Sequence, residues 1–109
     1  RGIYISEDGG ESWSQSLFVS DSTGAIDLIM DPQNPQFMMA AMWERVRRPV
    51  FNSQTHLFGQ SSGLYRTYDG GVHWQRLGTA NGLPDSKQVS IGRIGLALFA
   101  GPPRVLYAL

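Results

Sequence analysis

The acidic side chains are the first candidates for chemistry, because hydrolysis of a glycosidic bond needs two carboxylates on either side of the scissile bond. Asp27 interrupts an apolar strand pattern over residues 25–31, which makes it the first candidate for a catalytic acid or base. Glu44 is the second candidate. Each has a structural alternative: Asp27 can be a polar residue satisfied by hydrogen bonds, and Glu44 can form a solvated ion pair with Arg45. The catalytic residues, and whether the protein is an enzyme, stay open at this stage.

Residues 36–43 form a nearly continuous apolar run, which predicts a strand buried on both faces. A second group of side chains could bind a ligand, and it lies at and after the end of this run. Its members are Trp43, Arg45, Arg47, Arg48 and His56. Guanidinium groups can hold a carboxylate or a phosphate through paired hydrogen bonds. An arginine run is also common on surfaces that face solvent or a protein partner, and a tryptophan at a strand end is common in packing. Ligand binding in this segment is thus one of two interpretations.

The sequence indicates no metal, nucleotide or other cofactor. His56 and His73 are isolated, without neighbouring side chains at the spacing of metal ligands. The chain has neither a glycine-rich phosphate loop nor a recognisable Ser-His-Asp arrangement.

Two matching segments must position these side chains. Residues 6–13 read Ser-Glu-Asp-Gly-Gly-Glu-Ser-Trp, and residues 67–74 read Thr-Tyr-Asp-Gly-Gly-Val-His-Trp. Glycine, an aliphatic residue and tyrosine precede both copies, at 2–4 and at 63–65. A recurrence of this length indicates a repeat architecture.

Each copy predicts a hairpin corner, and the first corner closes a hairpin with strands over residues 2–8 and 12–19. The residues before the aspartate alternate as in a half-buried strand, and Asp-Gly-Gly is a strong turn signal. The carboxylate can accept backbone N–H groups, the glycines can adopt positive φ, and the tryptophan can cover the turn. We therefore expect structural roles for the corner residues, with contact to a ligand or metal as the alternative. The corner residues are Ser6, Asp8, Gly10, Trp13, Thr67, Asp69, Gly71 and Trp74.

Both corners fit the pattern Ser/Thr-x-Asp-x-Gly-x-x-Trp, and in these residues the chain resembles the Asp-box, or BNR, repeat family. The resemblance implies a β-propeller whose corners sit on the outer rim, away from the central binding surface. The family includes sialidases, xyloglucan-cleaving glycosidases and sortilin-type receptors. The run 43–49 is also similar to a stretch in sortilin-like bacterial proteins labelled glycosyl hydrolases. The Arg-Ile-Pro signature of sialidases is absent, and Arg93-Ile94-Gly95 matches only its first two residues.

Composition favours the all-β class. Thirteen glycines and six prolines in 109 residues indicate many turns, and this length allows one domain or less. Nine basic and nine acidic residues give no reason to expect nucleic acid or an anionic membrane. No apolar run approaches the roughly 20 residues of a membrane-spanning helix. The absence of cysteine is compatible with either side of a membrane. The chain has neither an initiator methionine nor a signal-peptide pattern, so we expect a piece of a longer protein. The resemblance to the Asp-box family implies that this longer protein is bacterial and is secreted or periplasmic.

A second recurrence divides the chain into units. Ile26-Asp27-Leu28 matches Ile94-Gly95-Leu96 at a spacing of 68 residues, whereas the corners repeat at a spacing of 61. The seven extra residues fall between the second corner and residue 94, where the loop 78–87 is longer than its first counterpart. Stacked repeats tolerate insertions in loops.

The resemblance implies a partial β-propeller over residues 1–109. Residues 2–19 would supply strands 3 and 4 of one blade, residues 25–78 a complete four-stranded blade, and residues 93–109 strands 1 and 2 of the next. A closed propeller has about four to eight blades, so the expected partners are the remainder of the propeller or other copies of the chain. The predicted function is a recognition or structural scaffold that takes a glycan or peptide ligand. The alternatives are part of a glycoside-hydrolase cleft and a sortilin-like peptide-binding propeller.

Overall fold

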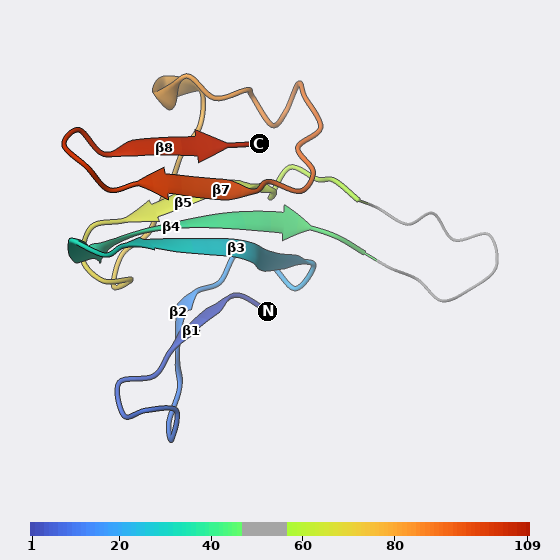
Figure 1. The fold of residues 1–109 in the computed structure, drawn as a ribbon. Helices are drawn as coiled ribbons and strands as arrows, with labels where there is room; N and C mark the ends of the chain where they lie inside the picture. The colour runs from blue at the N-terminus through green and yellow to red at the C-terminus, as the bar shows by residue number, and fades with distance from the viewer. Residues whose placement is uncertain (47–56) are drawn as a thin grey trace.

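The computed structural model describes residues 1–46 and 57–109, and its regular structure consists of strands and one short 3-10 helix (Figure 1). In chain order the elements are β1 (Ile3–Ile5), β2 (Ser14–Leu17), β3 (Thr23–Asp31), β4 (Asn34–Glu44), β5 (Gly63–Thr67), β6 (Gln75–Arg76), the helix η1 (Thr79–Asn81), β7 (Leu96–Phe99) and β8 (Val105–Ala108). The predicted all-β class is confirmed. In the described residues no helix has the length and apolar character needed to cross a membrane.

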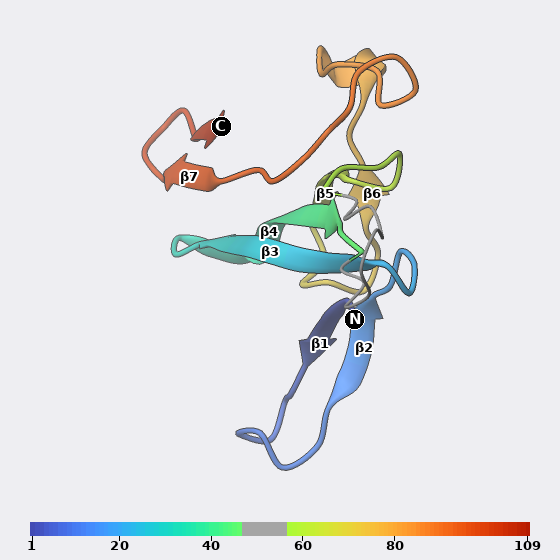
Figure 2. The same ribbon diagram turned by 90° about the vertical axis from the view of Figure 1, so that its right-hand side faces the viewer.

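The strands form three antiparallel sheets, which Figure 2 shows from the side. β1 pairs with β2, β7 pairs with β8, and four strands lie in the order β3-β4-β5-β6. The strands predicted at 25–31 and 36–43 lie within or overlap β3 and β4. The hairpin predicted over residues 2–19 is also confirmed, with shorter strands than expected.

β4 supplies half of the buried hydrophobic residues in the described part of the chain, because side chains on both of its faces are covered. Alternate residues of a strand point to opposite faces, and here both sets are apolar. One cluster of buried residues joins β4 to the first hairpin and consists of Ile3, Leu17, Ala40, Met42 and Tyr65. The second cluster is extended by partly buried residues of the β7–β8 hairpin, and its buried members are Met39, Ala41, Leu64 and Leu77. The apolar run 36–43 predicted a strand buried on both faces, and this is confirmed.

The two hairpins lie on opposite sides of the four-stranded sheet. The β1–β2 hairpin, with the N-terminus, lies below this sheet in both ribbon views, and the β7–β8 hairpin, with the C-terminus, lies above it (Figures 1 and 2). The four-stranded sheet is therefore the middle layer of the molecule.

Both recurrences of the sequence are also recurrences of strand register. At the spacing of 68 residues, the pairs Leu28–Ala40, Ile29–Met39 and Met30–Met38 of β3–β4 return in β7–β8 as Leu96–Ala108, Ala97–Tyr107 and Leu98–Leu106. At the spacing of 61, the pairs Tyr4–Gln15 and Ile5–Ser14 of β1–β2 return in β5–β6 as Tyr65–Arg76 and Arg66–Gln75. A slip of one residue would turn every side chain to the opposite face, so equal registers mean that equivalent residues can have equivalent surroundings.

Candidate functional site

The first Asp-Gly-Gly corner is closed by hydrogen bonds to Ser6 and Asp8. The Ser6 hydroxyl donates to Asp8 Oδ1 at 2.8 Å. The amides of Gly10 and Ser12 donate to Ser6 Oγ and Asp8 Oδ1, at 2.7 and 2.9 Å. Asp8 Oδ2 accepts the hydroxyl of Ser12. Gly9 and Gly10 have φ values of 76° and 101°, which few other residues adopt without strain.

The second corner repeats these contacts one by one. The Thr67 hydroxyl donates to Asp69 Oδ1 at 2.7 Å. The amides of Gly71 and His73 donate to Thr67 Oγ1 and Asp69 Oδ1, at 3.0 and 2.9 Å. Asp69 Oδ2 lies 2.7 Å from His73 Nδ1, which takes the place of the Ser12 hydroxyl. The two corners therefore share one hydrogen-bonding plan.

These hydrogen bonds hold the pKa of both corner carboxyls well below the usual range. The largest cause is the Ser12 hydroxyl for Asp8 and the His73 backbone N–H for Asp69. Both carboxyls are consequently ionised at neutral pH and engaged within their own corners. A carboxylate in this state fastens backbone and is a poor proton donor.

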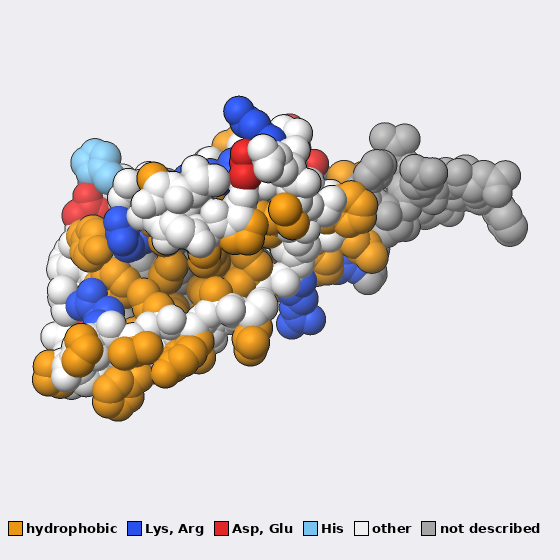
Figure 3. Space-filling model, turned by 90° about the horizontal axis from the view of Figure 1, so that it is seen from above, with side chains coloured by type: hydrophobic (Ala, Val, Ile, Leu, Met, Phe, Trp, Pro, Cys, Tyr) orange, Lys and Arg blue, Asp and Glu red, His pale blue; other side chains and the backbone are white. Residues whose placement is uncertain are grey.

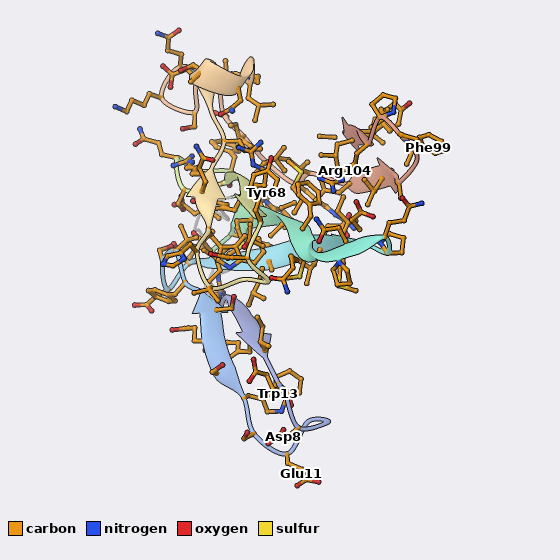
Figure 4. All side chains as sticks on the ribbon, turned by 90° about the vertical axis from the view of Figure 1, so that its left-hand side faces the viewer. Asp8, Glu11, Trp13, Tyr68, Phe99 and Arg104 are labelled. Carbon is orange, nitrogen blue, oxygen red and sulfur yellow. The ribbon has the colours of Figure 1, made fainter. Side chains whose placement is uncertain are left out.

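The tryptophans of the two corners have different surroundings. Trp13 is 63% exposed, and its Nε1 donates to the Gly10 carbonyl oxygen of its own corner at 3.0 Å. In Figure 4, Trp13 and Asp8 lie at the end of the first hairpin that is remote from the middle sheet. Trp74 is half-buried against the first cluster, and its Nε1 donates to Ser16 Oγ in β2 at 2.9 Å. The second corner is thereby fastened to the first hairpin.

Asp27, the first catalytic candidate, joins two sheets. Its Oδ1 accepts the Leu28 amide at 2.9 Å, and its Oδ2 accepts the Leu96 amide at 2.8 Å. Leu96 begins β7, so this carboxylate connects β3 to the β7–β8 hairpin, which is the third hairpin. The position of Asp27 is that of a polar residue satisfied by hydrogen bonds, the structural alternative given for it above.

Asp31 forms a turn and also an ion pair. Its Oδ1 accepts the Gln33 amide at 2.9 Å, as expected for a turn-forming aspartate. Its Oδ2 accepts Arg104 Nε at 2.6 Å, and the Arg104 guanidinium lies 3.9 Å from the centre of the Phe37 ring. The Gln33 amide is the largest cause that lowers the pKa of Asp31. Figure 4 labels Arg104, which lies between the third hairpin and the middle sheet.

The other predicted residues surround the end of β4. Glu44 Oε2 accepts the amide and the hydroxyl of Ser61, at 3.1 and 2.6 Å. Trp43 Nε1 donates to the Leu57 carbonyl oxygen at 2.6 Å, and the Arg45 guanidinium lies 4.9 Å from the centre of the Trp43 ring. The structure thus brings Trp43 and Arg45 together. The remaining candidates, Arg47, Arg48 and His56, lie outside the described residues.

A cavity of about 650 Å³ lies between β5–β6, the segment 78–91 and the end of the third hairpin. Leu64, Leu77 and Ile94 are among its apolar lining residues, and Arg76, Ser86 and Lys87 are among the polar ones. Figure 3 shows hydrophobic side chains gathered around a hollow on the side of the molecule that carries the third hairpin. Cavities of roughly 300 to 1,000 Å³ with apolar walls and a few polar groups are typical of small-molecule sites.

Arg76 holds the wall of this cavity together. Its Nη2 donates to the carbonyl oxygen of Ser62 at 3.0 Å and to the hydroxyl of Ser86 at 3.1 Å. Sequence reasoning did not place a site here. The available signal was the extra length of the loop 78–87, because long connections often carry function.

Among residues 1–46 and 57–109, no three His, Asp or Glu side chains gather as a group of metal ligands. Comparisons of the chain with protein-family models, with curated proteins and with solved structures found no match.

Proposed function

We propose that the chain is a segment of an Asp-box, or BNR, β-propeller that serves as a recognition or structural scaffold. In this proposal residues 25–78 form one blade, and residues 2–19 and 93–109 belong to the blades on either side. The observation that carries the proposal is the shared hydrogen-bonding plan of the Asp8 and Asp69 corners. The equal registers of the hairpins at spacings of 61 and 68 residues support it further. Secretion and a bacterial origin stay predictions.

The cavity beside β5–β6 is the place where this scaffold would bind a ligand. Its size and apolar lining suit a small molecule or a short segment of a polymer. Arg76 and Lys87 line it together with a single acid, Asp85, so the charge favours an acidic ligand. An acidic oligosaccharide or an acidic peptide meets both conditions.

The test uses saturation-transfer NMR to measure whether the chain binds members of a panel of neutral and acidic oligosaccharides and peptides. Leu83→Trp fills the cavity with a larger side chain, and Asp8→Asn weakens a corner far from it. We expect an acidic member of the panel to bind, Leu83→Trp to abolish the signal, and Asp8→Asn to retain it at a temperature where both variants are folded. Loss of binding in both variants, or in neither, would refute the cavity as the site.

The glycoside-hydrolase alternative has less support, because Asp27 and Glu44 both accept backbone amides. Turnover of an aryl glycoside that disappears in Asp27→Asn or Glu44→Gln would favour that alternative. A sortilin-like function would appear in the panel as binding of peptides without binding of sugars.

A further inference from the structure

We infer that Asn81 is a modification site, at which the side-chain amide is lost without an enzyme and the residue becomes aspartate or isoaspartate. The inference depends on the Asn81–Gly82 pair and on its surroundings in the segment 78–83. It stands or fails independently of the proposed function.

The reaction uses the side chain of Asn81 and the backbone nitrogen of Gly82. This nitrogen gives its proton to hydroxide and bonds to Asn81 Cγ. The bond between Cγ and Nδ2 breaks, and the amide nitrogen takes up a proton and leaves as ammonia, so that a cyclic succinimide forms. Water then adds to either carbonyl carbon of the ring and opens it. One opening gives aspartate, and the other gives isoaspartate, whose main chain runs through the former side chain.

The sequence favours Asn81 over the other asparagines of the chain. Asn34 precedes Pro35, whose nitrogen carries no proton. Asn52 precedes a serine and lies outside the described residues. Asn81 precedes Gly82, which has no Cβ to obstruct the approach of its nitrogen to Cγ. Ring closure therefore meets the least steric resistance at Asn81.

The turn around η1 supplies a group that assists the attack. Asn81 is the last residue of η1, and Gly82 follows it with a φ of 82°. Both residues are exposed, so water and hydroxide reach them. The Gly78 amide donates to Asn81 Oδ1 at 3.1 Å. This donor polarises the Cγ carbonyl and stabilises the negative charge that develops on Oδ1 during the attack.

One hydrogen bond of the turn must open before the reaction. The Gly82 amide donates to the Thr79 carbonyl oxygen at 3.0 Å, which holds its proton in place. η1 has three residues and buries none of them, and both ribbon views place it at the periphery of the molecule (Figures 1 and 2). Opening this turn therefore exposes no core. We expect the folded chain to react more slowly than the unfolded chain by at most about tenfold, which corresponds to about 1.4 kcal/mol of opening free energy.

The Asp-Gly bonds of the two corners can form the same ring, and they serve as an internal comparison. An aspartate closes the ring from its protonated form, in which the hydroxyl leaves as water. Hydrogen bonds, chiefly from the Ser12 hydroxyl in one corner and the His73 backbone N–H in the other, hold the pKa of both carboxyls below the usual range. Asp8 and Asp69 are consequently ionised at neutral pH. The corners protect these two residues, whereas η1 leaves Asn81 reactive.

The test is incubation of the folded chain at neutral and at mildly alkaline pH. Peptide mapping by mass spectrometry locates the change from amide to acid, and an isoaspartyl methyltransferase labels isoaspartate. Each conversion adds a negative charge to a chain whose formal net charge is zero, so anion exchange separates the product. We expect conversion at Asn81 to rise with pH and to yield isoaspartate, while circular dichroism shows that the chain stays folded.

Two variants separate ring closure from other causes. Asn81→Gln has a longer side chain, which must close a larger ring, so we expect no acidic product at this position. Gly82→Ala adds a Cβ beside the attacking nitrogen. In urea, where the turn is absent from both chains, we expect this variant to react about tenfold more slowly than the wild type, which corresponds to about 1.4 kcal/mol in the barrier.

Any of three results would overturn the inference. An unchanged Asn81 in the folded chain, under conditions in which the unfolded chain converts, would mean that η1 blocks the reaction. Aspartate without isoaspartate would mean that water cleaves the side-chain amide directly. Faster isomerisation at Asp8 or Asp69 than conversion at Asn81 would mean that the corners do not protect their aspartates.

Discussion

The indole nitrogen of Trp74 donates a hydrogen bond to the hydroxyl of Ser16 over 2.9 Å, although 58 positions separate the two residues. The same hydroxyl donates to the Gly71 carbonyl oxygen at 2.6 Å. One serine of β2 thereby fastens both the turn and the tryptophan of the second corner. At the first corner, the equivalent indole of Trp13 donates to Gly10 instead.

Ser16→Ala is expected to destabilise the protein by about 1 to 3 kcal/mol, because the Trp74 N–H and the Gly71 carbonyl both lose a partly buried partner. Urea unfolding followed by tryptophan fluorescence measures the change. Ser14→Ala in the same strand is the control: that serine is exposed, and we expect an effect within about 0.5 kcal/mol. Similar losses in the two variants would contradict the contact.

Gly71→Ala is expected to cost more than Gly10→Ala, although the two glycines are equivalent in the corners and have φ values of 92° and 101°. A Cβ at Gly71 would lie 2.7 Å from Ser16 Oγ and 2.9 Å from Ile5 Cδ1, whereas at Gly10 the nearest atom is Trp13 Cζ2 at 3.8 Å. Backbone strain accounts for about 1 to 2 kcal/mol in both, and the collision adds about 1 to 3 kcal/mol at Gly71. Chemical denaturation of the two variants gives the two losses of unfolding free energy. Equal losses would show that the positive φ alone, without the collision at Gly71, causes the destabilisation.

Acid is expected to unfold the protein progressively below about pH 4. The pKa values of Asp8, Asp31 and Asp69 are lower in the folded state than the unfolded value of about 3.9, so the unfolded chain takes up protons first. The stabilisation from these carboxylates is complete above that value and is lost as the pH falls through the folded-state values. The urea concentration at the midpoint of unfolding, measured from neutral to acid pH, reports the slope of stability against pH. Asp8→Asn does not titrate at that position, so its slope should be shallower; an unchanged slope would refute the role of Asp8.

Arg104→Met is expected to loosen the third hairpin from the middle sheet. The substitution keeps an extended apolar side chain but removes the ion pair with Asp31 and the contact with the Phe37 ring. The cation–π contact alone is worth about 0.5 to 2 kcal/mol. Hydrogen exchange of β7 and β8 amides should accelerate more than that of β1 and β2. Arg104→Lys is the control, since it keeps the charge and should recover part of the protection; uniform acceleration in both hairpins would contradict this role.

Local structure could be predicted from the sequence because its causes are local. In the corner at Asp8 and the corner at Asp69, the groups that donate to the aspartate and to the Ser6 or Thr67 hydroxyl all lie within four residues of their acceptor. The alternation of residues 25–31 and the apolar run 36–43 likewise indicate strands by themselves.

Contacts between units could not be predicted in the same way. Asp31 pairs with Arg104 across 73 residues, and nothing near either residue indicates the partner. Trp13 and Trp74 occupy equivalent motif positions, yet only Trp74 meets β2, because the neighbouring hairpin decides its surroundings. The cavity has the same origin, since its lining residues come from β5, β6, the segment 78–91 and the third hairpin.

The segment 78–94 absorbs the seven-residue difference between the two repeat spacings, and most of the same segment lines the cavity. The hairpin registers on either side of it are unchanged. Length and composition can therefore vary in this surface connection while the strands keep their partners. For protein engineers, this makes residues 78–94 a natural graft point, where new specificity can be introduced without redesigning the framework.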